Sequence, residues 1–285
     1  MRWLRAAQCH SMGRILQPRA RAGADIPSLL WEQAWTSLAF VRRYGADAQA
    51  RLRELCGQFL TTKVMTGAGG LQLTGAIQAN IALQACIPVL ELGIDWYRGW
   101  SGIVVYPSEF MVRRQVQDDS GVVHDYGEEL SGEAWQGGPV VLSWSQEPPT
   151  ATTPQFAFNA VIHEFAHKLD QLDGEADGRP PFDRRLHAGL APRQWNAIRD
   201  DAFERFNAAI DLIEAQLPSD LDPESGEAAR FYAGLALDPY AAQDHAEFFA
   251  VSSESFFVEP ARLSDAFPQW YRMLADFYRQ DPMKA

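Results

Sequence analysis

The chain has 285 residues, and because 47% of them are hydrophobic it can bury a sizeable core in one large or two small domains. Its net charge is -12, with 37 acidic and 25 basic side chains, which argues against nucleic acid or an anionic membrane surface as the main partner. Three widely spaced cysteines without a C-x-x-C pair indicate neither a disulfide framework nor a cysteine zinc site, and no apolar run reaches the about 20 residues of a membrane span, so we expect a cytoplasmic protein.

The first 24 residues carry arginines but no acidic side chain, and they lack the continuous apolar stretch of a secretory signal. They predict a basic, disordered tail in front of one domain that spans residues 25–285. An upstream start site, with Met12 or a later residue as the true beginning, is the alternative explanation.

Residues 25–100 are expected to be helical. Apolar residues recur at helical spacing from residue 26 to 57 and again from residue 77 to 92, which predicts two amphipathic helices and then a buried one. A glycine-rich turn at residues 67–70 lacks the G-K-[ST] sequence of a phosphate-binding loop, so we assign it no phosphate role.

Residues 101–175 are expected to form a small sheet followed by a helix. Short β-rich runs at residues 103–107, 122–124 and 139–144 are separated by turn-rich segments. In zinc peptidases a strand in this place lines the cleft and can pair with substrate backbone, and residues 140–144 are our candidate. The alternative is an ordinary internal strand.

The sequence H-E-x-x-H stands at residues 163–167, inside an apolar run with helical spacing. Thr153 and Pro154 suit the N-cap and the first position of this helix, and Gly174 suits its end. Residues four apart lie nearly above one another on a helix, so we expect His163 and His167 to project from one face.

Two imidazoles so placed can bind one Zn²⁺ and leave positions for a third protein ligand and a water. Zinc lowers the pKa of bound water to near neutrality, and Glu164, beside His163, can take the proton and pass it to a leaving amine. The sequence therefore predicts peptide hydrolysis with Zn²⁺ as the cofactor. Asp170, three residues after His167, is expected to fix the tautomer of a ligand. The alternative is a helix whose two histidines form hydrogen bonds with neighbouring residues and bind no metal.

Residues 176–285 are again expected to be helical, with patterns over residues 184–216, 227–237, 245–257 and 260–278. The segment at residues 217–226 reads as a loop between them.

The third ligand must come from outside the motif. Asp173 follows the second histidine at a spacing used by another class of zinc peptidases. Glu247 and Glu254 are seven residues apart on one face of a later helix. Glu247 also has a structural alternative, because Asp244 before it would make a D-x-x-E capping box. The residues alone leave these three candidates open.

Three separated segments together resemble the MtfA family: residues 138–144, 163–174 and 247–251. This family comprises bacterial zinc-dependent peptidases named for titrating the glucose-responsive repressor Mlc. The likeness extends from about Leu30 to Tyr278.

The resemblance implies an α+β, zincin-like metallopeptidase of the gluzincin type, mostly helical, with a small sheet next to the H-E-x-x-H helix. It implies His163, His167 and Glu247 as zinc ligands and Glu164 as general base. The catalytic core of the family is similar to that of anthrax lethal factor, in which a tyrosine seven residues before the glutamate ligand faces the zinc. Tyr240 stands at that spacing and could donate to the oxyanion; without the resemblance it is a turn tyrosine.

The resemblance is compatible with two functions. The first is a peptidase that removes terminal residues, as members of the family do. The second is a regulatory protein that sequesters an Mlc-like transcriptional repressor, with a structural or gating zinc site. A zinc hydrolase acting on a non-peptide amide is a third interpretation. We expect a monomer, and the remaining histidines are expected to lie outside the site: His10, His124, His187 and His245.

Overall fold

The fold is that of a computed structural model. It describes residues 23–107, 110–117, 123–130, 132–134, 138–144, 157–218, 220–223 and 225–284, with the backbone alone for the strands between residues 110 and 134. The predicted tail at residues 1–24 lies, apart from its last two residues, outside the described residues.

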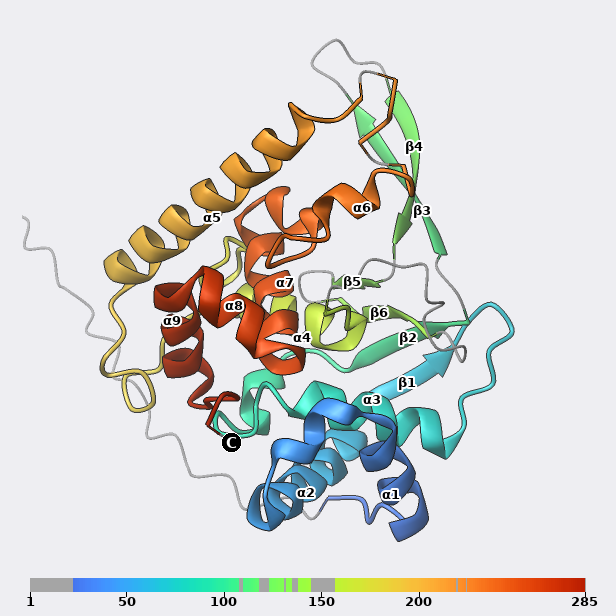
Figure 1. Cartoon of the computed structure of the whole chain (residues 1–285). Helices are drawn as coiled ribbons and strands as arrows, with labels where there is room; N and C mark the ends of the chain where they lie inside the picture. The colour runs from blue at the N-terminus through green and yellow to red at the C-terminus, as the bar shows by residue number, and fades with distance from the viewer. Residues whose placement is uncertain are drawn as a thin grey trace, which may run out of the picture.

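Helices dominate the described chain, and a small sheet lies between two helical parts, as predicted (Figure 1). The N-terminal part contains α1 (Ser28–Ser37), η1 (Ala39–Arg43), α2 (Ala46–Thr62), β1 (Val64–Gly67), α3 (Gly75–Cys86) and η2 (Ile94–Tyr97). The middle part contains β2 (Gly102–Tyr106), β3 (Phe110–Gln117), β4 (Val123–Leu130), β5 (Gly132–Ala134) and β6 (Val140–Ser143). The C-terminal part contains α4 (Ala160–Asp170), η3 (Gln171–Asp173), α5 (Pro192–Glu214), α6 (Ala229–Tyr232), η4 (Pro239–Ala242), α7 (His245–Val258), α8 (Pro260–Ala266) and α9 (Pro268–Tyr278).

The main sheet has the strand order β1-β2-β6-β5. The first three strands are parallel, and β5 runs antiparallel to β6 with Ala134 opposite Val140. Strands β3 and β4 form a separate antiparallel hairpin that extends away from this sheet (Figure 1). The sequence did not predict β1, β3 or β5.

The position of β6 corrects one prediction. Residues 140–143 do form a strand, but β2 pairs with one side of it and β5 with the other. Because both sides are taken, a substrate backbone cannot add to this strand without displacing β5. The internal-strand alternative is therefore the right one for residues 140–142, whereas the pairing described for Ser143 and Trp144 is with Tyr106 of β2.

Helix α4 is fixed by its apolar face. Ile162, Phe165 and Leu169 are fully buried, and the Phe165 ring packs 5.0 Å from that of Tyr97 and 5.5 Å from that of Phe59, between centroids. This face meets the N-terminal helical part and the sheet, so the opposite face is left for polar side chains.

Helix α4 begins later than expected. Residues 157–159 are not helical, and the Asn159 side chain caps the helix by accepting a hydrogen bond from the Ile162 N–H at 2.9 Å. The predicted cap at Thr153 and Pro154 is thus wrong, although those two residues themselves lie outside the described ranges. The predicted end is right, since a short η3 turn leads to Gly174 with a left-handed φ of 111°.

Helix α7 packs against α4 and is buried on most of its circumference. Phe248 stacks on Trp270 and Phe249 stacks on Tyr278, which holds α7 against α9. A helix buried all round cannot rotate without disrupting this packing, so its few acidic side chains have defined directions. Among the described residues, no helix combines the length and the apolar character needed to cross a bilayer.

Gly178 lies between the last residue of α4 and the first residue of α7. Its N–H donates to Asp170 Oδ2 at 2.8 Å, and its carbonyl accepts from the indole of Trp195 at 2.9 Å. Its φ is +74°, and a Cβ at this place would lie 2.2 Å from the carbonyl oxygen of His245. Glycine is therefore required here by both conformation and space.

We expect Gly178→Ala to destabilise the fold by at least about 2 kcal/mol, because it adds left-handed strain to a backbone clash. Gly189→Ala is the matched control: nothing lies within 4 Å of its Cβ position, and its φ is not positive. Urea unfolding of both variants measures the difference. Equal unfolding midpoints for the two variants would contradict this account of the contact.

Candidate metal centre

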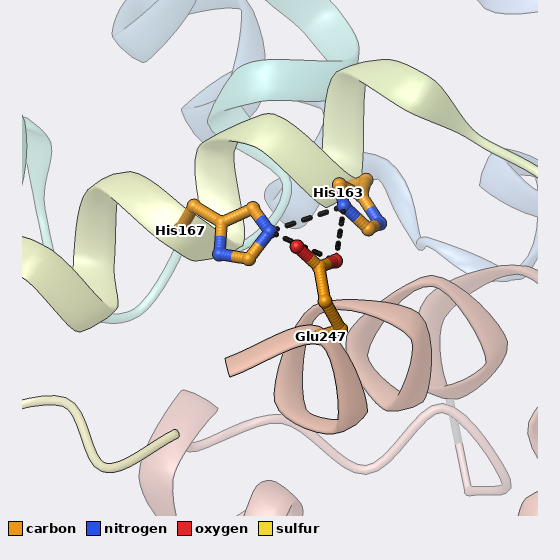
Figure 2. Close-up of side chains that lie close together, drawn as sticks. All are labelled: His163, His167 and Glu247. Carbon is orange, nitrogen blue, oxygen red and sulfur yellow. Dashed lines mark hydrogen bonds and ion pairs between the residues drawn. The ribbon is translucent and has the colours of Figure 1, made fainter. Parts of the chain in front are cut away.

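Three potential ligand atoms from α4 and α7 meet at one point (Figure 2). The Nε2 atoms of His163 and His167 are 3.1 Å apart, and Glu247 Oε2 lies 3.1 Å from the first and 3.3 Å from the second. The two histidines are one helical turn apart on α4, and Glu247 reaches them from the first turn of α7. The structure thus brings together residues separated by 80 positions in the chain.

The spacing of these atoms fits a tetrahedral metal ion. For bonds of about 2.0–2.1 Å, tetrahedral geometry places neighbouring ligand atoms about 3.3 Å apart. When both imidazole nitrogens are unprotonated, all three atoms offer lone pairs and repel one another unless a proton or a metal ion lies between them. The chemistry of the donor set therefore fits a divalent cation at the centre of the three atoms.

Glu254 determines which nitrogen of His163 faces this centre. Its Oε1 lies 2.7 Å from His163 Nδ1, and the side chain is only 3% exposed. A carboxylate can only accept, so Nδ1 carries the hydrogen and Nε2 keeps its lone pair for a metal. Glu254, considered above as a ligand, instead contacts the nitrogen of His163 that faces away from this centre.

The orientation of Glu254 is itself fixed by hydrogen bonds. Its Oε2 accepts from the backbone N–H of Asn159 at 2.5 Å. The Asn159 side chain caps α4 and also donates to Gln84 Oε1 of α3 at 2.6 Å. Helices α3, α4 and α7 therefore converge on one polar cluster, in which each buried group restrains the next.

The pKa shifts of the cluster show how strongly it favours positive charge. Burial lowers the pKa of His163, but the hydrogen bonds to Glu247 and Glu254 outweigh it and hold this pKa well above the ordinary value. Burial raises the pKa of Glu247, but its hydrogen bonds to His163 and His167 bring it far below the usual range. Opposite shifts of this kind are expected where carboxylates stabilise positive charge on neighbouring imidazoles.

Glu164 lies beside the metal centre without taking part in the triangle. Its side chain is 3% exposed, and its Oε2 has no hydrogen-bond partner among the described residues. Burial raises the pKa of this carboxyl to about 7. A buried carboxylate with an unused oxygen and a pKa near neutrality can accept a proton and release it again.

Tyr240 is an exposed residue beside His163. Its ring centroid is 6.1 Å from that of His163, and 41% of the residue is exposed. It belongs to η4, whose N-cap Asp238 accepts a hydrogen bond from the Tyr240 N–H at 2.9 Å.

Two of the predicted roles for acidic residues differ from the structure. Asp173 is exposed in η3 and does not contribute to the group of ligand atoms. Asp170 is fully buried, and its Oδ2 accepts from Gly178 N–H, so it fastens the loop after α4. The carboxylate that contacts the outer nitrogen of His163 is that of Glu254, a role that the sequence had not predicted for it.

The capping box predicted around Glu247 is half formed. Asp244 Oδ1 accepts from the N–H groups of Ala246 and Glu247, at 2.8 and 2.9 Å. The Glu247 carboxylate, however, points to the histidines (Figure 2).

Two other histidines lie away from the centre. His187 is buried against Phe277, and His245 lies near Asp200. His10 and the side chain of His124 lie outside the described residues.

Comparison with known proteins identifies close relatives. The profile of the family described as glucose-regulated metallo-peptidase M90 matches residues 14–279, which begins before the expected start near Leu30. The Mlc titration factor A of Klebsiella pneumoniae subsp. pneumoniae is 37% identical over 261 residues, covering 91% of this chain and 88% of that protein. The Mlc titration factor A of Enterobacter sp. (strain 638) is 36% identical over 257 residues, covering 90% and 88%. The protein of the same name from Salmonella typhi is 36% identical over 253 residues, covering 88% and 86%.

We expect Glu254→Gln to weaken Zn²⁺ binding by about 10–100-fold, the usual effect of losing a carboxylate that supports a ligand. Glutamine replaces one of the two acceptor oxygens by an NH2 group, which cannot accept, so either His163 Nδ1–H or Asn159 N–H loses its partner. Glu247→Ala should weaken binding more, whereas Asp173→Ala should leave it unchanged. Competition with a chromophoric chelator gives the three affinities. The assigned roles of Glu254 and Glu247 would be refuted if Glu254→Gln bound zinc as tightly as the wild type. They would also be refuted if Asp173→Ala lowered the zinc affinity as much as Glu247→Ala does.

Proposed function

The chain belongs to the glucose-regulated metallo-peptidase M90 family, and on this premise we propose that it is a zincin-like, zinc-dependent peptidase of the gluzincin type. In this proposal His163, His167 and Glu247 hold the ion. The observation that carries it is the triangle of three lone-pair atoms with sides of 3.1 to 3.3 Å. A divalent ion so held polarises a carbonyl and lowers the pKa of water from 15.7 to about 7.

Glu164 acts as the general base. It takes a proton from the attacking water and passes it to the amine that leaves. Burial raises the pKa of this carboxyl, and a neighbouring divalent cation would favour its ionised form, which is the form that accepts the proton. Its burial also keeps bulk water from competing for the unpartnered oxygen.

Tyr240 stabilises the tetrahedral intermediate. Its phenol donates a hydrogen bond where the carbonyl oxygen becomes negative, which is worth most in the transition state. The proximity of its ring to His163 supports this role.

The proposed peptidase removes residues from a free N-terminus, the activity that the family resemblance implies. We place it in the cytoplasm as a monomer, on the evidence of its composition and of the same resemblance. Comparing peptides with free and acetylated N-termini tests the aminopeptidase assignment.

A second proposed function is protein binding. The relatives are named as titration factors for Mlc, which favours an Mlc-like transcriptional repressor as a partner of this chain as well. Binding that persists in Glu164→Gln, measured with a purified Mlc-type repressor, would separate this function from peptide cleavage. Loss of binding together with cleavage would tie both to the catalytic carboxylate.

Glu164→Gln should lower kcat for peptide hydrolysis by about 10²–10⁴-fold, because an amide cannot take up the proton. Zinc content should stay at the wild-type value, since Glu164 is not a ligand in this account. Glu175→Gln removes an exposed carboxylate from the segment after α4 and serves as the control. Steady-state kinetics measures kcat, and metal analysis measures the zinc content. Peptide cleavage by Glu164→Gln at the wild-type rate would refute the mechanism.

Tyr240→Phe should lower kcat by about 10²–10³-fold with little change in KM, as expected when an oxyanion donor is removed. The phenyl ring preserves the packing against His163. Steady-state kinetics measures both constants. If KM rises while kcat stays constant, Tyr240 instead contributes to substrate binding.

A further inference from the structure

A cavity of about 390 Å³ lies between the C-terminal end of α5, helix α6 and η4. Its volume is within the about 300–1,000 Å³ typical of ligand sites. The residues that line it and carry the argument are Ile210, Glu214, Tyr232, Asp238, Pro239 and Ala242.

The lining combines apolar surface with two carboxylates. None of the described lining residues carries a positive charge. Glu214 is hydrogen-bonded to Tyr232, which fixes its direction. The hydrogen bond described for Asp238 uses Oδ1, so Oδ2 remains for another donor. Burial raises the pKa of Asp238, as it does for a carboxyl whose charge is not fully compensated. A positively charged group on an apolar stem matches this lining.

The cavity adjoins the metal centre through η4. Three residues from Asp238 to Ala242 line the cavity, while the Tyr240 ring of the same short element lies beside His163. Asp238 is close enough to His163 and Glu254 for the charges to shift one another's pKa. Because η4 contributes both to the lining of the cavity and to the surroundings of His163, a group bound in the cavity lies one short element away from a substrate held at the metal centre.

We propose that this cavity binds an ammonium or guanidinium group of the substrate, with Asp238 and Glu214 as its acceptors. The group is the α-ammonium of the first residue or the end of a lysine or arginine side chain. The identification of the ligand as substrate rests on the proposed peptidase function; the recognition of the cation does not.

The test is a binding titration on the full chain carrying Glu164→Gln, which prevents turnover, with zinc and after its removal. Four probes separate the two sources of charge. L-Argininamide has both cations, N-acetyl-L-argininamide only the guanidinium, L-norleucinamide only the α-ammonium, and N-acetyl-L-norleucinamide neither. We expect the fully neutral probe to bind at least about tenfold more weakly than the best cationic one, the usual order of effect for a charged hydrogen bond.

Variants on this background locate the binding site. Asp238→Asn keeps a side chain able to cap η4, and Glu214→Gln is the second, independent variant. Each should weaken binding of the preferred cation about tenfold and leave the neutral probe unaffected. Asp211→Asn is the matched control, because it removes one negative charge from an exposed position of α5 that does not line the cavity.

The outcomes are distinct. If acetylation of the probe weakens binding, the cavity binds the α-ammonium. If replacing arginine by norleucine weakens binding, the cavity binds the side-chain cation. Either result supports the proposal. Equal binding of all four probes, or cation binding unchanged in Asp238→Asn and Glu214→Gln, overturns it. Failure of the zinc-loaded wild type to cleave any peptide would refute the peptidase function and leave this binding result standing.

Discussion

Three lone-pair atoms held in mutual contact require a positive charge between them. The nitrogens of His163 and His167 and the carboxylate of Glu247 are 3.1 to 3.3 Å apart in a partly buried site, where such a cluster is costly unless a cation neutralises it. The surrounding hydrogen bonds preserve this arrangement, since Glu254 keeps a proton on the outer nitrogen of His163. The site is therefore built to hold a cation before any substrate arrives.

The rest of the fold serves to hold two helices in register. The apolar face of α4 is buried against the aromatic rings of the N-terminal part, and α7 is held by stacking against α9. Asn159 and Gly178 connect the ends of α4 to α3, α5 and α7. A displacement of either helix by a fraction of its pitch would separate the ligand atoms, so the packing of the core determines the geometry of the site.

Much of this could be predicted from local pattern. The helical period placed His163 and His167 on one face, and the composition and segment pattern indicated a mostly helical chain with a small sheet. The third ligand stayed open among Glu247, Glu254 and Asp173, because a contact across 80 residues depends on tertiary packing that no local period encodes. Glu254 took the role expected of Asp170 for the same reason: both lie at suitable spacings, and only the approach of α7 decides which carboxylate reaches the ring of a histidine. The strand β5 was missed because three residues give too short a pattern.

One metal ion bound between α4 and α7 is the central claim. It is tested most directly by X-ray diffraction at the zinc absorption edge, with crystals grown in the presence of stoichiometric zinc. The account predicts one anomalous peak, at about 2.0–2.2 Å from His163 Nε2, His167 Nε2 and a carboxylate oxygen of Glu247. A peak coordinated by Asp173 or by other residues in place of Glu247, or zinc bound only at the surface with the two imidazoles turned apart, would contradict it.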